Sequence, residues 1–167
     1  MPKNLAAEDE KSVSDLYKNT DVAESYIDKR FALSWNRLLH DRQVSAVNRG
    51  IKAFCPKKLL EVAPGPARIA TDLAGVQSGV MVEFSEQMIE VGRARLRDAG
   101  LDTVWEVKHG NAFELEEFYH HFDMIFTFRF VRHFATKDRN RIYKQLHSCL
   151  HPGGIVIFDV VNRHIRD

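Results

Sequence analysis

The sequence predicts an α/β domain built on a mostly parallel sheet. Short apolar runs recur along the 167 residues, and segments with helical periodicity separate them. Two of these runs end in an acidic residue, Glu61 and Glu83, and a Pro/Gly turn follows the first. Strands that alternate with helices in this way are typical of βαβ units. The hydrophobic content of 44% agrees with a single globular domain.

The part of the chain ahead of the first strand is expected to be helical. A broken helical pattern runs from Ser14 to about Phe31. A second helix follows, with apolar residues at three- and four-residue spacing along one face: Val44, Val47, Ile51 and Phe54. We therefore expect a helical segment over residues 1–55 that forms a lid, and a cofactor-binding core over residues 56–167.

The stretch from Leu59 to Ala74 predicts a buried strand, a tight turn and a helix. Gly65 has no Cβ, so the backbone at this turn permits close approach of a ligand. Pro64 and Pro66 stiffen the turn, and Pro66 lacks the backbone N–H that a diphosphate cradle requires. The turn is therefore typical of a site for an adenosine-containing cofactor, but it matches the dinucleotide fingerprint poorly and is poorly suited to phosphate. The alternative is an ordinary connection from strand to helix.

A second strand, Val80 to Ser85, also ends in an acid. Glu83 lies 22 residues after Glu61. A carboxylate at that offset accepts hydrogen bonds from the two ribose hydroxyls of an adenosine that lies across the strand ends. The alternative for Glu83 is a solvated strand end.

The rest of the chain continues the alternation. Ser85 is expected to cap a helix that ends at Gly100, with Met88, Ile89 and Leu96 on its buried side. Further strands are expected at Val104–Lys108, at Phe122–Phe128 and, covered on both faces, at Ile155–Val161. Before the last strand, Thr136 is expected to cap a helix whose inner side carries Ile142, Leu146 and Leu150.

Four motifs in order resemble the class I S-adenosylmethionine-dependent methyltransferases. They are Glu61 to Arg68 (EVAPGPAR), Gly110 to Phe113 (GNAF), Phe122 to Phe134 (FDMIFTFRFVRHF) and Leu150 to Gly154 (LHPGG). The resemblance implies a three-layer Rossmann-like fold with strand order 3-2-1-4-5 and S-adenosylmethionine as cofactor. It also implies methyl transfer to an oxygen or nitrogen of a small or medium polar acceptor.

The resemblance assigns cofactor contacts residue by residue. Asn111 is expected to hydrogen-bond the adenine amino group, with the backbone of Ala112 close by and Phe113 packed on the ring. Ala63 and Ala67 stand where the family usually has glycines. The full expected set is Glu61, Ala63, Pro64, Gly65, Pro66, Glu83, Phe84, Met88, Asn111, Ala112, Phe113 and Phe128.

The acceptor is expected at the carboxyl end of the fourth strand, where open parallel sheets bind ligands. His133 is the candidate general base, and Arg129 and Arg132 are candidate anchors for an anionic acceptor. Tyr26, with Tyr17 and Trp35, is a candidate pocket wall. Packing or surface roles are the alternatives for each. The chain lacks the Asn/Asp-Pro-Pro-aromatic motif and the Pro-Cys pair, which disfavours nucleobase methylation.

Charge and composition exclude several other classes. The 24 basic and 23 acidic residues give no electrostatic footprint for nucleic acid or an anionic membrane. Cys55 and Cys149 are far apart and form no CxxC pair, and His120 and His121 lack acidic or cysteine partners at ligand spacing, so we expect no metal. With neither a long apolar run nor a signal peptide, the expected location is the cytoplasm.

The chain departs from the family pattern after the fifth strand. A complete class I member continues with a helix and an antiparallel pair of strands, whereas this sequence stops after Asn162–Asp167. We expect the fifth strand to be an exposed sheet edge that a second copy or another partner covers. Arg163, His164 and Arg166 are expected at the active-site end of the sheet, where they could meet an acceptor. Two rival functions remain. One is a non-catalytic scaffold or cofactor-binding protein, and the other is a nicotinamide-dependent oxidoreductase, against which Arg68 and Pro66 count.

Overall fold

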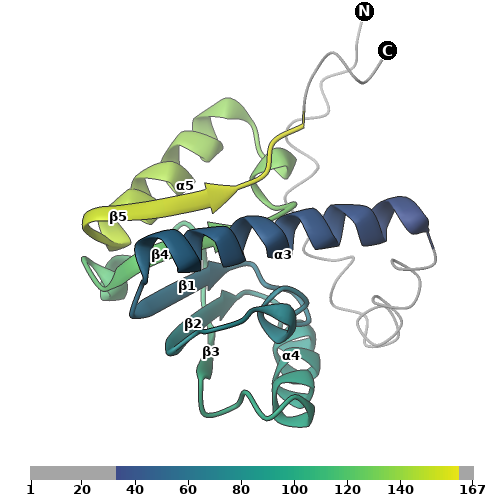
Figure 1. Ribbon diagram of the computed structural model, residues 1–167. Helices are drawn as coiled ribbons and strands as arrows, with labels where there is room; N and C mark the ends of the chain where they lie inside the picture. The colour runs from purple at the N-terminus through teal and green to yellow at the C-terminus, as the bar shows by residue number, and fades with distance from the viewer. Residues whose placement is uncertain (1–32, 162–167) are drawn as a thin grey trace, which may run out of the picture.

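A computed structural model describes residues 33–161 of the chain as a sheet flanked by helices (Figure 1). The strands of this part follow the order β3-β2-β1-β4-β5, and every neighbouring pair is parallel. This confirms the predicted fold class and strand order. The strands are β1 (Lys58–Val62), β2 (Ser78–Glu83), β3 (Trp105–His109), β4 (Phe122–Thr127) and β5 (Leu150–Phe158). The helices are α3 (Ser34–Phe54), α4 (Glu86–Asp98) and α5 (Thr136–Cys149), with short 3-10 turns η1 (Ala70–Asp72), η2 (Glu116–Phe118) and η3 (Val131–His133).

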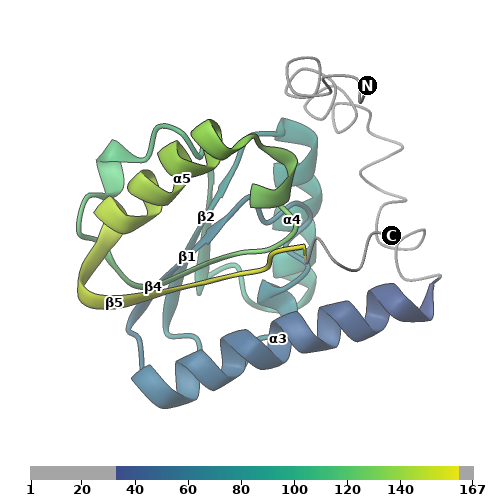
Figure 2. The same ribbon diagram turned by 90° about the horizontal axis from the view of Figure 1, so that it is seen from above.

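Two hydrophobic clusters hold helices on opposite faces of the sheet, because successive strand residues point to opposite sides. Leu59 of β1 packs in a cluster with Val47 of α3 and Leu96 of α4. The next residue, Leu60, packs in the other cluster with Ile142 of α5. Figure 2 shows the sheet lying between α3 and α5. The carboxyl ends of the central strands are thus left for the connecting loops.

The predicted start and stop of α4 are confirmed. The hydroxyl of Ser85 accepts a hydrogen bond of 3.3 Å from the backbone N–H of Met88. Gly100 follows the helix with a φ of 67°, the left-handed conformation that glycine adopts without steric cost. Met88, Ile89 and Leu96 are buried as expected. The cap fixes the direction of the chain immediately after Glu83.

The helix predicted after the first turn is wrong in extent. Only η1 forms there, because Ala67 has a φ of 55° that interrupts a helical path and Gly75, with a φ of 73°, ends the segment. Within it, the Thr71 hydroxyl bonds the carbonyl oxygens of Ala67 and Arg68 and competes with the regular backbone ladder. The chain therefore reaches β2 through a loop whose side chains remain close to α3.

Other boundaries shift by a few residues. α5 begins at Thr136 itself, so Ala135 and not Thr136 occupies the cap position. β5 begins at Leu150 rather than Ile155, and Val160 and Val161 lie beyond it and are exposed. The strand is only partly covered because it is the edge of the described sheet, with β4 as its partner. The expectation of cover on both faces is thus wrong.

α3 is a single helix whose buried face is more polar than predicted. Its buried residues are His40, Gln43, Val47 and Gly50, whereas Phe54 is 60% exposed. Trp35, a candidate pocket wall, is 65% exposed. The segment Ser14–Phe31, for which a broken helix is predicted, lies outside the described residues, and the proposed boundary at residue 55 stays a prediction.

Candidate active site

The acid at the end of β1 is enclosed by the protein. Glu61 is 3% exposed, and its Oε2 atom has no hydrogen-bond partner among residues 33–161. Burial raises the pKa of this carboxyl to about 8, although the positive charge of Arg68 opposes the shift; the negative charge of Glu83 adds to it. A buried acceptor without a donor is costly. Glu61 is therefore suited to a ligand that brings a donor or a positive charge.

Glu83 at the end of β2 organises the neighbouring turn. Its Oε2 accepts a 2.9 Å hydrogen bond from the backbone N–H of Gly65. Its Oε1 accepts bonds of 2.9 Å from the N–H groups of Phe84 and Ser85. Burial raises the pKa of Glu83, while these three hydrogen bonds and the nearby His109 oppose that shift. Since the residue is buried, the alternative of a solvated strand end is wrong, and its contact with ribose stays a prediction.

The turn after β1 is left-handed at three alternate residues. The φ angles are 54° at Ala63, 59° at Gly65 and 55° at Ala67. A Cβ added to Gly65 would meet none of the atoms that the structure describes within 4 Å, so the turn faces open space in this part of the chain. Pro64 and Pro66 are buried between these positions. The two alanines carry the steric cost that glycine avoids, about 1 to 2 kcal/mol per residue.

We predict that replacing Ala63 by glycine stabilises the protein. Ala63→Gly removes a Cβ from a left-handed residue, and we expect a gain of up to about 1 kcal/mol after the entropic cost of glycine. Ala94, in the middle of α4, is the matched control. Ala94→Gly should destabilise the protein by about 0.5 to 1 kcal/mol. Urea denaturation of both variants checks the pair, and destabilisation by Ala63→Gly would contradict the strain.

The loop after β3 uses the side chain that was expected to bind adenine. The Oδ1 atom of Asn111 accepts a 3.0 Å bond from the N–H of Phe113 and so shapes the loop itself. Phe113 is half-buried, and its ring makes an edge contact with Phe134 at 5.4 Å. Ala112 is buried. To accept a hydrogen bond from the adenine amino group as predicted, Asn111 must therefore use the second lone pair of the same Oδ1 atom.

Phe84 and His109 form an exposed ring pair beside Glu83. Phe84 is 54% exposed and stacks on His109, with ring centroids 5.9 Å apart. The Nε2 atom of His109 lies 3.0 Å from the carbonyl oxygen of Phe84. His109 was missed by the sequence analysis. The feature that could have revealed it is its position as the last residue of β3, which pairs with Glu83 in the parallel register of β2 and β3.

Of the residues expected to bind the methyl acceptor, Arg129 contacts α3, whereas Arg132 and His133 are exposed. Arg129 has a φ of 60°, and its Nη1 donates to Asn36 Oδ1 on α3 at 3.4 Å, so it is engaged with the helix. Arg132 and His133 lie on η3 and are exposed. Phe128, which was expected to contact the cofactor, is half-buried, with its ring centroid 6.1 Å from that of Phe126. Other candidates lie outside the described residues: Tyr17, Tyr26, Arg163, His164 and Arg166.

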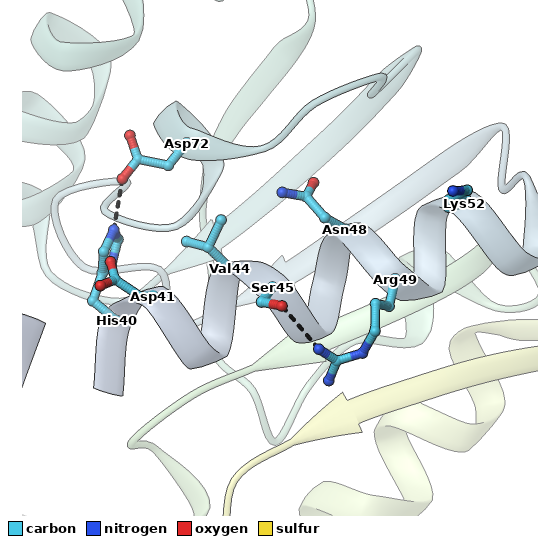
Figure 3. A pocket seen from close by; sticks show the side chains of 8 residues that line it. All are labelled: His40, Asp41, Val44, Ser45, Asn48, Arg49, Lys52 and Asp72. Carbon is cyan, nitrogen blue, oxygen red and sulfur yellow. Dashed lines mark hydrogen bonds and ion pairs between the residues drawn. The ribbon is translucent and has the colours of Figure 1, made fainter. Parts of the chain in front are cut away.

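A shallow hollow follows the side of α3. Figure 3 shows the residues that line it, seven from α3 and one, Asp72, from η1. None of the residues predicted for the cofactor lines this hollow. Its lining is His40, Asp41, Val44, Ser45, Asn48, Arg49, Lys52 and Asp72.

Residues 33–161 hold no group of three His, Cys, Asp or Glu side chains arranged to bind a metal ion. Within the same range, no helix combines the length and the apolar character needed to cross a bilayer. Both cysteines are free thiols; Cys55 is exposed and Cys149 is buried.

Comparison with known proteins gives a family. A family model described as a methyltransferase domain matches residues 59–154. The demethylmenaquinone methyltransferase of Bacillus subtilis (strain 168) is 31% identical over 149 residues, which cover 85% of this chain and 58% of that protein. The chain thus spans less than two thirds of the length of the curated relatives that it matches.

Solved structures share the fold at lower identity. The complex of DhpI with SAH has a TM-score of 0.69 at 19% identity, covering 93% of this chain and 71% of that chain. The cyclase SpnF has a TM-score of 0.63 at 20% identity, covering 75% and 46%. These similarities show the fold alone, because one fold hosts many reactions. The family match, together with the strand order and the acids that end β1 and β2, shows that the chain belongs to the class I S-adenosylmethionine-dependent methyltransferases.

Proposed function

We propose that this chain binds S-adenosylmethionine at the carboxyl ends of β1 and β2 and transfers its methyl group to a small or medium polar acceptor. The observation that carries the proposal is the buried Glu61, whose Oε2 lacks a donor among the described residues. The cofactor is positively charged and carries an ammonium group, and such a charge favours the ionised form of this buried carboxyl. The family itself implies this cofactor.

The residues present fit such a cofactor. Gly65 faces open space, so the backbone of the turn is accessible. Glu83 presents a carboxylate beside that turn, and the exposed ring of Phe84 offers a flat apolar surface next to it. S-adenosylmethionine supplies a methyl group already activated on a sulfonium. The work left to the protein is to position the acceptor and exclude water.

His133 and Arg132 are the residues of the chain that we assign to the acceptor. Both are exposed on η3, next to the end of β4. An imidazole in this place removes a proton from a hydroxyl or an ammonium group before it is methylated. A guanidinium binds a carboxylate or phosphate of the acceptor in a bidentate manner. We propose oxygen or nitrogen as the attacking atom on this basis.

Calorimetric titration tests the cofactor. We expect micromolar binding of S-adenosylmethionine and of its demethylated product, S-adenosylhomocysteine (SAH), and no binding of NAD. Binding of NAD alone would favour the oxidoreductase. If none of the three binds, the scaffold function becomes the better proposal. Transfer of radiolabelled methyl groups to a panel of alcohols, amines and carboxylates then tests catalysis, with His133→Ala as the variant expected to lose activity.

A quinone acceptor is a second candidate. The relatives that match this chain are named for demethylmenaquinone. The start of α3 and the end of β5 lie at the same end of the sheet, where the arrowheads of the strands point in Figure 1. Both places carry exposed apolar residues. They are Leu33, Trp35, Leu38, Phe158, Val160 and Val161. Adding demethylmenaquinone in detergent to the same transfer assay separates this candidate from the polar acceptors.

A further inference from the structure

Five polar side chains are linked along the buried face of α3. They form what we call the polar chain: Asp72, His40, Arg68, Gln43 and Asp159. His40 Nε2 lies 2.6 Å from Asp72 Oδ2, and its Nδ1 lies 2.6 Å from Arg68 Nη1. The first of these contacts is the dashed line between His40 and Asp72 in Figure 3. A guanidinium only donates, so Nδ1 accepts and the proton of the ring is on Nε2, which donates to Asp72. His40, Gln43 and Arg68 are all at least nine-tenths buried.

Gln43 is the central link of the polar chain. Its Oε1 accepts a 2.9 Å hydrogen bond from Arg68 Nη2. Its Nε2 donates a bond of 2.9 Å to Asp159 Oδ2. A carboxamide offers an acceptor and a donor at once, which neither an acid nor a cation does. Gln43 therefore joins a cation from the turn after β1 to an acid that follows β5.

The far end of the polar chain holds the loop after β4. The second oxygen of Asp159 accepts a 2.6 Å hydrogen bond from the backbone N–H of Arg129. Arg129 has a φ of 60°, a conformation that costs free energy for a residue with a side chain and persists only when its surroundings hold it. This loop leads directly into η3, which carries Arg132 and His133.

We propose that Gln43 is a positioning residue that couples the cofactor turn to the acceptor loop. Arg68 lies three residues after Gly65, and its charge acts on the buried Glu61. A change at the cofactor turn thus reaches Arg129 through Gln43 and Asp159. The assignment of the two loops to cofactor and acceptor rests on the proposed function, whereas the physical coupling does not.

The coupling is tested first without any ligand. We expect Gln43→Leu to speed hydrogen exchange of the Arg129 amide, measured by NMR on the full chain, by about five- to tenfold, because the loss of one hydrogen bond has that size. Gln43→Glu keeps an acceptor for Arg68 but places a carboxylate against Asp159. This variant should speed exchange of the Arg129 amide by the same factor, and it replaces Gln43→Leu in the test if the leucine variant does not fold.

Gln145 of α5 is the matched control. Like Gln43, it accepts one hydrogen bond and donates another to an acid, but on the opposite face of the sheet: it accepts from the backbone N–H of Leu115 and donates to Glu116. Gln145→Leu should leave the Arg129 amide unchanged within twofold. Arg68→Met should speed that amide in the wild-type background and not in the Gln43→Leu background. Equal exchange of the Arg129 amide in wild type and Gln43→Leu would overturn the proposal.

Addition of SAH extends the test to function. In the wild-type chain, saturating SAH should slow exchange of the Arg129 amide by about fivefold or more, and in Gln43→Leu by less than twofold. Equal slowing in both proteins would overturn the coupling. Failure of the wild-type chain to bind SAH would instead refute the proposed function, while the exchange rates without ligand still decide whether Gln43 couples the loops.

Discussion

Replacing Glu61 by glutamine is expected to flatten the pH dependence of stability. The pKa of Glu61 is raised by burial from 4.5 to about 8. Between these two values the folded protein keeps a proton that the unfolded chain has released. Unfolding therefore releases a proton in this window, and the free energy of unfolding falls as pH rises, by at most about 1.4 kcal/mol per pH unit. The contribution is fully present below pH 4.5 and is lost by about pH 8.

Urea denaturation of wild type and Glu61→Gln at several pH values between 5 and 8 measures this effect. The variant should be clearly more stable than wild type at pH 8. At pH 5, where the wild-type carboxyl is protonated and resembles an amide, the two should agree within about 1 kcal/mol. Glu90→Gln, on the exposed side of α4, is the control and should follow wild type throughout. Parallel profiles for wild type and Glu61→Gln would contradict the raised pKa.

Glu83→Ala is expected to weaken binding of S-adenosylmethionine by about 1 to 3 kcal/mol, or roughly five- to 150-fold in Kd. The carboxylate is predicted to accept hydrogen bonds from the ribose. It also holds the N–H of Gly65 at 2.9 Å, so its loss removes an anchor of the cofactor turn. Both effects act in the same direction.

Calorimetric titration of folded Glu83→Ala with S-adenosylmethionine and with SAH checks this expectation. Glu90→Ala is again the control, since it removes an acid from the exposed side of α4 without touching the turn. Circular dichroism confirms that each variant is folded before it is titrated. Unchanged affinity in a folded Glu83→Ala protein would remove Glu83 from the cofactor site.

Local patterns were sufficient for much of the fold. The apolar runs located all the strands of the described sheet, and the cap at Ser85 and the stop at Gly100 follow from turn and capping chemistry within a few residues. The extent of η1 could not be predicted in this way. It depends on the left-handed backbone of Ala67, which is set by the packing of the whole turn and not by the preference of alanine.

The candidate site was only partly predictable. Glu61 and Glu83 were found because an acid at the end of an apolar strand is a visible pattern. His109 was not, because its partner Phe84 lies 25 residues away and becomes a neighbour only through the register of β2 and β3. Asn111 was found, but its hydrogen bond to the loop backbone was not.

The sequence by itself determined the class of this protein: strands with acidic ends, a turn around Gly65 and an ordered set of motifs, all of which are properties of neighbouring residues. Tertiary structure decided what those residues experience. Glu61 acquires its raised pKa only when folding buries its carboxyl away from water. Gln43 meets Asp159 across 116 residues of sequence. Burial and long-range pairing are properties of the folded chain, so no local pattern contains them.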